Sequence, residues 1–179
     1  MKKLLFLALV FFVGTLTAQV KPKHTVKPLT KADYVAFINK TNDIIKETWK
    51  IVQQTEVYTG ALLVAKDMQK KSFDAFKNKE LNKALTLSAN AREFCYHAYV
   101  KNKQQPAPRD WHPGPKYRPF ITKHFTKNEI LNKLQQVNKE DEKNFSPNDL
   151  TDIDDNSKGK TQDEPNDNGD NSKGKTQQN

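Results

Sequence analysis

The stretch that decides the fold is LNKALTLSANAREFCYHAY, from Leu81 to Tyr99. A helix advances about 100° per residue, so one narrow stripe of a helix here holds only small side chains. These are Ala84, Ser88, Ala91, Cys95 and Ala98. Larger apolar side chains, among them Leu85 and Phe94, flank the stripe on both sides. This pattern is typical of a core-facing helix that lets a neighbouring backbone approach closely.

A first helix is predicted to begin at Lys31. Thr30 stands at the N-cap, Asp33 three residues later is able to complete a capping box, and Leu29 and Tyr34 form a hydrophobic staple. The threonines on its inner face can bond back to carbonyls of the same helix, so they need no separate role.

The first helix is expected to end near Tyr58, where Gly60 offers a left-handed cap. The alternative is one long helix that runs through Gly60, because an internal glycine costs only about 1 kcal/mol. Residues 61–77 again carry mostly small side chains on one face and are the natural partner of residues 81–99. Asn78 tolerates left-handed geometry and is expected to turn the chain between them.

Five prolines alternate with aromatic side chains from Lys101 to Lys123, a segment called the strap below. Prolines this close exclude a regular α-helix, while the aromatic rings indicate packing onto the helices. A full capping box of Thr126 and Glu129 then predicts a last short helix, with Phe125 and Ile130 as its staple. The predicted fold is therefore an all-α bundle of three or four helices with a proline-rich aromatic strap.

The first 18 residues have the pattern of a secretory signal peptide. Two lysines precede an apolar run from Leu4 to Val13, and small residues follow up to Ala18. The run is short for a membrane span, so we expect cleavage and a periplasmic or secreted protein without a transmembrane segment. An uncleaved anchor is the alternative. An extended basic leader, residues 19–28, is expected before a helical domain of residues 29–144.

Residues 145–179 are almost entirely polar, which predicts a disordered tail. The segment DNSKGKTQ occurs in it twice, at 155–162 and 170–177. Residues 169–176 match a phosphate-binding loop, but no apolar strand precedes them and no helix pattern follows. Residues 152–163 partly match a calcium loop and lack its turn glycine. We interpret both matches as chance features of a solvated tail.

The charge is unevenly distributed along the 179 residues, whose formal net charge is +9. Residues 19–145 hold 24 Lys and Arg against 13 Asp and Glu, whereas residues 146–179 hold 4 against 8. A basic body with an acidic tail favours solubility, weak anionic partners, or a tail that lies over the body. The single cysteine, Cys95, forms no internal disulfide, so it is either buried or part of an intermolecular bridge.

Histidines suggest one alternative function, a helical-bundle metal or haem carrier. Cys95 and His97 lie about 200° apart on a helix and so do not bind one ion together. His112 and His124 lie on or beside the strap and meet His97 only if the fold brings them there. No serine lies in a nucleophile-elbow context and no acidic pair lies in an apolar run, so no enzyme and no cofactor is predicted.

The best binding candidate is the strap, with Lys101 and Lys103 at its start, together with its basic neighbours Arg92 and Lys127. The predicted binding residues are Arg109, Trp111, Lys116, Tyr117 and Arg118. Cations among aromatic rings suit an anionic partner, and export favours a protein or envelope component over nucleic acid. The alternative interpretation is a strap whose rings pack inward and whose basic face is only solvated. The predicted function is an exported helical interaction or structural protein, with its oligomeric state open.

Overall fold

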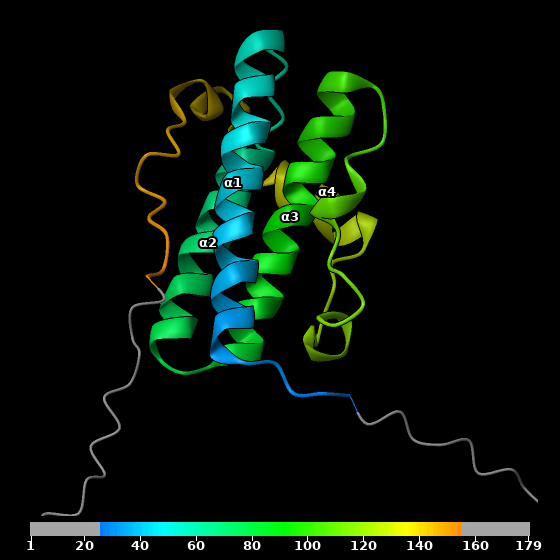
Figure 1. Ribbon diagram of the computed structural model, residues 1–179. Helices are drawn as coiled ribbons and strands as arrows, with labels where there is room; N and C mark the ends of the chain where they lie inside the picture. Colours follow the sequence, from blue (N-terminus) through cyan, green and yellow to red (C-terminus); the bar gives the residue numbers. More distant parts are fainter. Residues whose placement is uncertain (1–25, 155–179) are drawn as a thin grey trace, which may run out of the picture.

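Helices alone make up the regular structure of residues 26–154, the part of the chain that the computed structural model describes (Figure 1). No strand occurs within these residues, which confirms the predicted all-α class. The elements are α1 (Lys31–Thr55), α2 (Ala61–Lys77), α3 (Leu81–Lys103), η1 (Arg109–Trp111), η2 (Arg118–Phe120), α4 (Lys127–Gln135) and η3 (Lys139–Asn144), where η marks a 3-10 helix. The expected signal peptide, most of the leader, the duplicated segment and the phosphate-loop match lie outside the described residues.

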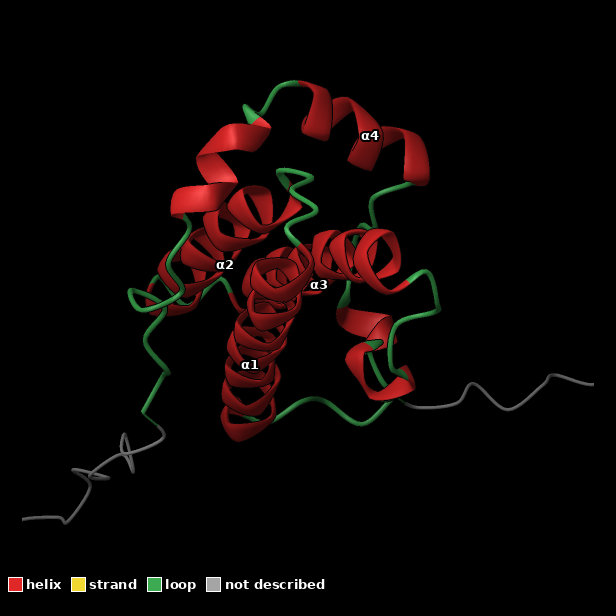
Figure 2. Ribbon diagram, turned by 90° about the horizontal axis from the view of Figure 1, so that it is seen from above, coloured by secondary structure: helices red, strands yellow, loops and turns green. Residues whose placement is uncertain are grey.

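The three long helices α1, α2 and α3 lie side by side, each antiparallel to the one before it (Figure 1). Viewed along them in Figure 2, α4 and η3 cover the side of α2 and α3 that faces away from α1. The strap follows the end of α3, which takes up the first three strap residues, and passes alongside that helix before α4 begins.

The small-residue stripe of α3 packs as predicted. Ala84, Ser88, Ala91, Cys95 and Ala98 are all fully buried. The hydroxyl of Ser72 on α2 donates to the Ala84 carbonyl at 2.8 Å, which requires the two helix backbones to approach closely. Small side chains at this seam make that approach possible.

Both predicted capping boxes are present, and the predicted break between α1 and α2 is confirmed. Thr30 Oγ1 accepts from the Asp33 backbone N–H, and the Asp33 carboxylate accepts from that of Thr30. However, α1 ends earlier than expected, because Glu56 already adopts the left-handed conformation with φ 55°. Gly60 is also left-handed, with φ 77°, but it serves as the N-cap of α2.

Two local expectations are wrong in detail. Between α2 and α3 the left-handed residue is Lys79, with φ 62°, whereas Asn78 has φ −80° and only caps α2. After α4, the charged run of residues 139–143 predicts that the helical pattern ends, yet residues 139–144 form η3.

The border of the folded domain lies beyond residue 144. Phe145 and Leu150 are buried, although the polar composition of residues 145–179 predicts that both belong to a disordered tail. The Phe145 ring lies 5.1 Å from that of Trp49, measured between centroids. Asn39 exchanges two hydrogen bonds with the backbone of Ile153. Residues 145–154 are therefore held against the helices by buried apolar side chains together with hydrogen bonds to the backbone.

Candidate functional site

A buried polar network crosses the interior between α1, α2 and α3. The Gln69 amide donates to Asn42 Oδ1 at 2.8 Å and to the Ile38 carbonyl at 2.9 Å. Ser88 Oγ lies 3.0 Å from Gln69 Oε1 and 2.8 Å from Thr41 Oγ1. Since buried polar groups are costly without partners, these bonds fix how the three helices meet.

Arg92 connects this hydrogen-bond network to the strap. Its guanidinium donates to Thr41 Oγ1 at 2.8 Å, to the Phe37 carbonyl at 2.7 Å and to the Trp111 carbonyl at 3.1 Å. It also lies 3.7 Å from the centroid of the Phe37 ring. The side chain is only 3% exposed, and no carboxylate within residues 26–154 forms an ion pair with it. Burial lowers the pKa of Arg92 to about 10, which still leaves it charged at neutral pH.

The aromatic side chains of the strap face the helices. Trp111 is 1% exposed, and its ring lies edge-on to that of Tyr99 at 5.1 Å. Tyr117 is half-buried, with its ring 4.7 Å from that of Phe37. The prediction of Trp111 as a binding residue is therefore wrong, because it is a core side chain. Arg92, counted among the basic neighbours of the strap, is buried as well.

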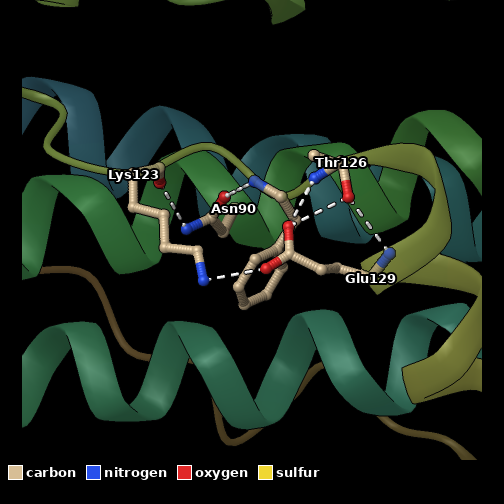
Figure 3. A network of polar contacts seen from close by, with 5 residues as sticks. Asn90, Lys123, Thr126 and Glu129 are labelled. Atoms are coloured by element: carbon tan, nitrogen blue, oxygen red, sulfur yellow. Dashed lines mark hydrogen bonds and ion pairs between the residues drawn. The ribbon is translucent and has the colours of Figure 1, made fainter.

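The strap is fixed at its far end by a second set of bonds, shown in Figure 3. The Asn90 side chain on α3 donates to the Lys123 carbonyl and accepts from the Phe125 N–H, both at 3.0 Å. Glu129 accepts from Thr126 and pairs with Lys123 Nζ at 2.8 Å. The Lys123 contact and then the Thr126 bonds lower the pKa of Glu129 to about 2. Lys123 is thus engaged within the protein.

Three of the five predicted binding residues present their charges to solvent. Arg109 and Arg118 are exposed, and neither lies within ion-pair distance of a carboxylate in the described part of the chain. Arg118 Nε donates to the Pro113 carbonyl at 3.2 Å. Lys116 is exposed too, but its Nζ lies 2.9 Å from Asp33 Oδ1. The structure therefore separates this set into three outward cations and two rings that pack inward.

Two ionisable side chains of α3, Tyr96 and Glu93, are partly or fully shielded from solvent. The Tyr96 hydroxyl is buried without a hydrogen-bond partner, and the His112 ring lies 4.3 Å from the Tyr96 ring. Burial, followed by the nearby Glu93, raises the pKa of Tyr96, and burial raises that of Glu93. At neutral pH Tyr96 therefore offers a proton donor and no activated nucleophile.

The predicted directions of Cys95 and His97 are confirmed. Cys95 is fully buried, and burial raises the pKa of its thiol to about 12, whereas His97 is half-buried on another face of α3. Because its sulfur is enclosed, Cys95 does not form an intermolecular bridge. Within residues 26–154 no three His, Cys, Asp or Glu side chains lie close enough to share one ion. The metal-carrier alternative thus has no specific contact in its favour and stays a prediction.

A second buried charge, Glu142, was missed by the sequence analysis. It comes from η3 and is fully buried. Its carboxylate accepts from the backbone N–H groups of Thr59 at 2.6 Å, Gly60 at 2.8 Å and Leu62 at 2.7 Å. These are orphan donors at the start of α2, so Glu142 caps that helix from a distance. No short-range signal announces such a cap, since its partners precede it by 80 or more residues.

Comparison with known proteins assigns no family to this chain. No protein-family model, curated protein or solved structure matches it. None of the helices within residues 26–154 is long and apolar enough to cross a bilayer.

Proposed function

We propose that the protein is an exported, non-enzymatic interaction module of the cell envelope or exterior. In this proposal it binds an anionic partner through Arg109, Lys116 and Arg118. The observation that carries it is the exposure of these three cations on a strap that is fastened to the helices. Two of the three have no carboxylate partner among the described residues.

Because the strap backbone is held against the helices, its cations form a preorganised binding surface. The Trp111 ring is buried, its carbonyl is held by Arg92, and Asn90 holds the Lys123 carbonyl. A partner therefore does not have to order this backbone when it binds, which removes one of the main costs of association.

The three cations are expected to contribute unequally. The guanidinium groups of Arg109 and Arg118 can each contact a carboxylate or phosphate with two parallel hydrogen bonds. Lys116 must first leave Asp33, whose carboxylate lies 2.9 Å from its ammonium group. We therefore assign the main attraction to the two arginines and a smaller share to Lys116.

The experiment compares two triple variants of the full chain in a pull-down from envelope extract. One variant carries Arg109→Glu, Lys116→Glu and Arg118→Glu. The matched control carries the same charge change at three lysines outside the strap. These are Lys46 and Lys50 on α1 and Lys77 on α2. Circular dichroism spectra first show that both variants keep their helices.

The proposal expects the strap variant to lose the partner that the parent chain captures, and the control to retain it. Added salt should release the partner from the parent chain, because exposed charges are screened within about 10 Å at 0.1 M salt. Equal capture by the two variants would end the proposal. So would capture that is insensitive to salt.

A further inference from the structure

A hollow of about 440 Å³ lies away from the strap cations, near the ends of α1 and α3. The α1–α2 connection, the last turns of α3, α4 and the start of η3 form its walls. This volume falls within the range of about 300–1,000 Å³ that is usual for small-molecule sites. We propose that the hollow binds a small organic anion, in which one carboxylate or phosphate group is joined to an apolar body.

The positive charges of the lining support the anionic half of this ligand. Lys101 from α3 and Lys139 from η3 line the hollow together with His97, and no Asp or Glu does. Neither lysine takes part in an ion pair or a side-chain hydrogen bond within the described residues. Two ammonium groups that face one hollow without an acid repel each other, and a bound anion would relieve this repulsion.

The pKa of His97 is consistent with the same surplus of positive charge. Burial, followed by the charges of Lys101, Lys139 and Lys127, lowers its pKa. These lysines come from α3, η3 and α4, so cations approach the imidazole from three elements. Glu93 stands one turn earlier on α3 but forms no ion pair with His97. At neutral pH the imidazole is therefore uncharged and offers one N–H donor to an anion.

Apolar side chains in the same lining support the apolar half of the ligand. Leu131 and Leu134 of α4 line the hollow, and Leu131 is 38% exposed, one of the few large apolar side chains so exposed in the described residues. Tyr58 and Gln135 also line the hollow, and their hydroxyl and amide groups are further hydrogen-bond donors. An apolar surface beside unpaired cations in one concave site fits an amphipathic small molecule better than a bare inorganic ion.

The lining of this site does not include Arg109, Lys116 or Arg118, the cations of the proposed function. Its failure therefore leaves the proposed function untouched, and the two are tested separately. The probes are phenyl phosphate, benzoate, the uncharged benzyl alcohol and inorganic phosphate, each titrated into the full chain and followed by NMR.

We expect saturable shifts of the His97 ring signals and of the Lys101, Leu131 and Lys139 amides with phenyl phosphate, with benzoate, or with both. The stronger of the two identifies the anionic group. Bound anion should also raise the pKa of His97, measured by pH titration of its ring signals. The double variant Lys101→Ala/Lys139→Ala should bind about tenfold more weakly, since charge-assisted hydrogen bonds are lost. The matched control Lys50→Ala/Lys77→Ala should bind like the parent chain.

Three results would overturn the proposal. These are unchanged affinity in the Lys101→Ala/Lys139→Ala variant, binding of benzyl alcohol as tight as that of benzoate, and binding of inorganic phosphate as tight as that of phenyl phosphate. Because both lysines lie at the rim of an open hollow, their replacement by alanine leaves the core intact, and the unperturbed amide spectrum of the variant verifies this.

Discussion

The strap and the C-terminal segment that contains η3 are each joined to the long helices by one buried charge, but the two charges have opposite signs. On the strap side, Arg92 reaches outward from α3 and donates to carbonyls. On the other side, Glu142 reaches inward from η3 and accepts from N–H groups at the start of α2. Glu142 is satisfied by backbone groups, Arg92 by two backbone carbonyls and the Thr41 hydroxyl, and neither forms an ion pair with a side chain of the described residues. A buried charge in this protein therefore fixes where a distant backbone segment lies.

The two junctions should differ in strength because their backbone partners differ. The Phe37 carbonyl that accepts from Arg92 also accepts from the Thr41 hydroxyl, so it keeps a partner when Arg92 is removed. The three N–H groups that Glu142 satisfies belong to Thr59, to the N-cap residue Gly60 and to Leu62 in the first turn of α2, where no helical carbonyl is available to them. Orphaned buried N–H groups are rarer and costlier than under-satisfied carbonyls.

The largest effect is therefore expected for Glu142→Ala. Loss of its three hydrogen bonds should lower the free energy of unfolding by about 3 to 4 kcal/mol, since each buried donor left unpaired costs about 1 to 3 kcal/mol. Urea denaturation measures this loss. Glu140→Ala, at an exposed residue that pairs only with Lys143, is the control and should change stability by less than about 0.5 kcal/mol. Equal losses in the two variants would show that the α2 cap has no special weight.

A smaller loss, about 2 kcal/mol, is expected for Arg92→Met. Methionine keeps the apolar stem of the side chain packed but removes the bond to the Trp111 carbonyl. Amide hydrogen exchange should speed up in the strap and not at the start of α2. Faster exchange at both places, or at neither, would contradict the separation of the two junctions. Arg109→Met, at an exposed arginine of the same strap, is the control.

Ala91→Leu acts on the seam between the long helices and on neither junction. An added isobutyl group in the fully buried stripe should overpack it by about 1 to 3 kcal/mol. Thermal unfolding measures the drop in melting temperature. If the melting temperature stays that of the parent chain, the stripe is not the contact surface described above.

The smallest effects concern two carboxylates at the surface, one on the strap side and one on the C-terminal side. Glu129 has its pKa lowered from 4.5 to about 2 by Lys123, and Asp149 from 3.8 to about 2 by Lys66 and Lys70. A pKa that is lower in the folded state stabilises the fold above the unfolded value, and this contribution is lost as the pH falls toward 2. Stability should therefore decline between about pH 4.5 and 2.

Two single substitutions test which carboxylate causes that decline in stability. Glu129→Gln should reduce its slope through the strap side and Asp149→Asn through the C-terminal side, both measured by urea denaturation at several pH values. An unchanged slope in both variants would contradict the two carboxylates as its source.

What the sequence predicts correctly is what depends on near neighbours. Thr30 with Asp33 and Thr126 with Glu129 are three residues apart, and both capping boxes are present. The stripe around Ala91 follows from helical periodicity alone. The left-handed positions are misplaced, because Glu56 and Lys79 adopt a conformation that their residue types disfavour.

The candidate site was only partly predictable. The pattern of rings and cations identifies the strap, but it does not tell which side of the strap each ring faces, so Trp111 was assigned to the surface. Arg92 and Glu142 depend on partners 19 to 83 residues away. The lysines around His97 come from three elements whose meeting no local spacing announces. The burial of Phe145 likewise depends on Trp49, which lies almost a hundred residues earlier.

The cap on α2 also sets an order of assembly. A chain that is synthesised from its N-terminus can form the hairpin of α2 and α3 early, because the contacting residues are near in sequence and such contacts form quickly. The start of α2, however, has no carboxylate cap until residue 142 has followed, 80 residues after Leu62. A late segment of the chain thus completes one of its earlier helices, and a nascent chain that ends before Glu142 lacks the side chain that caps that helix.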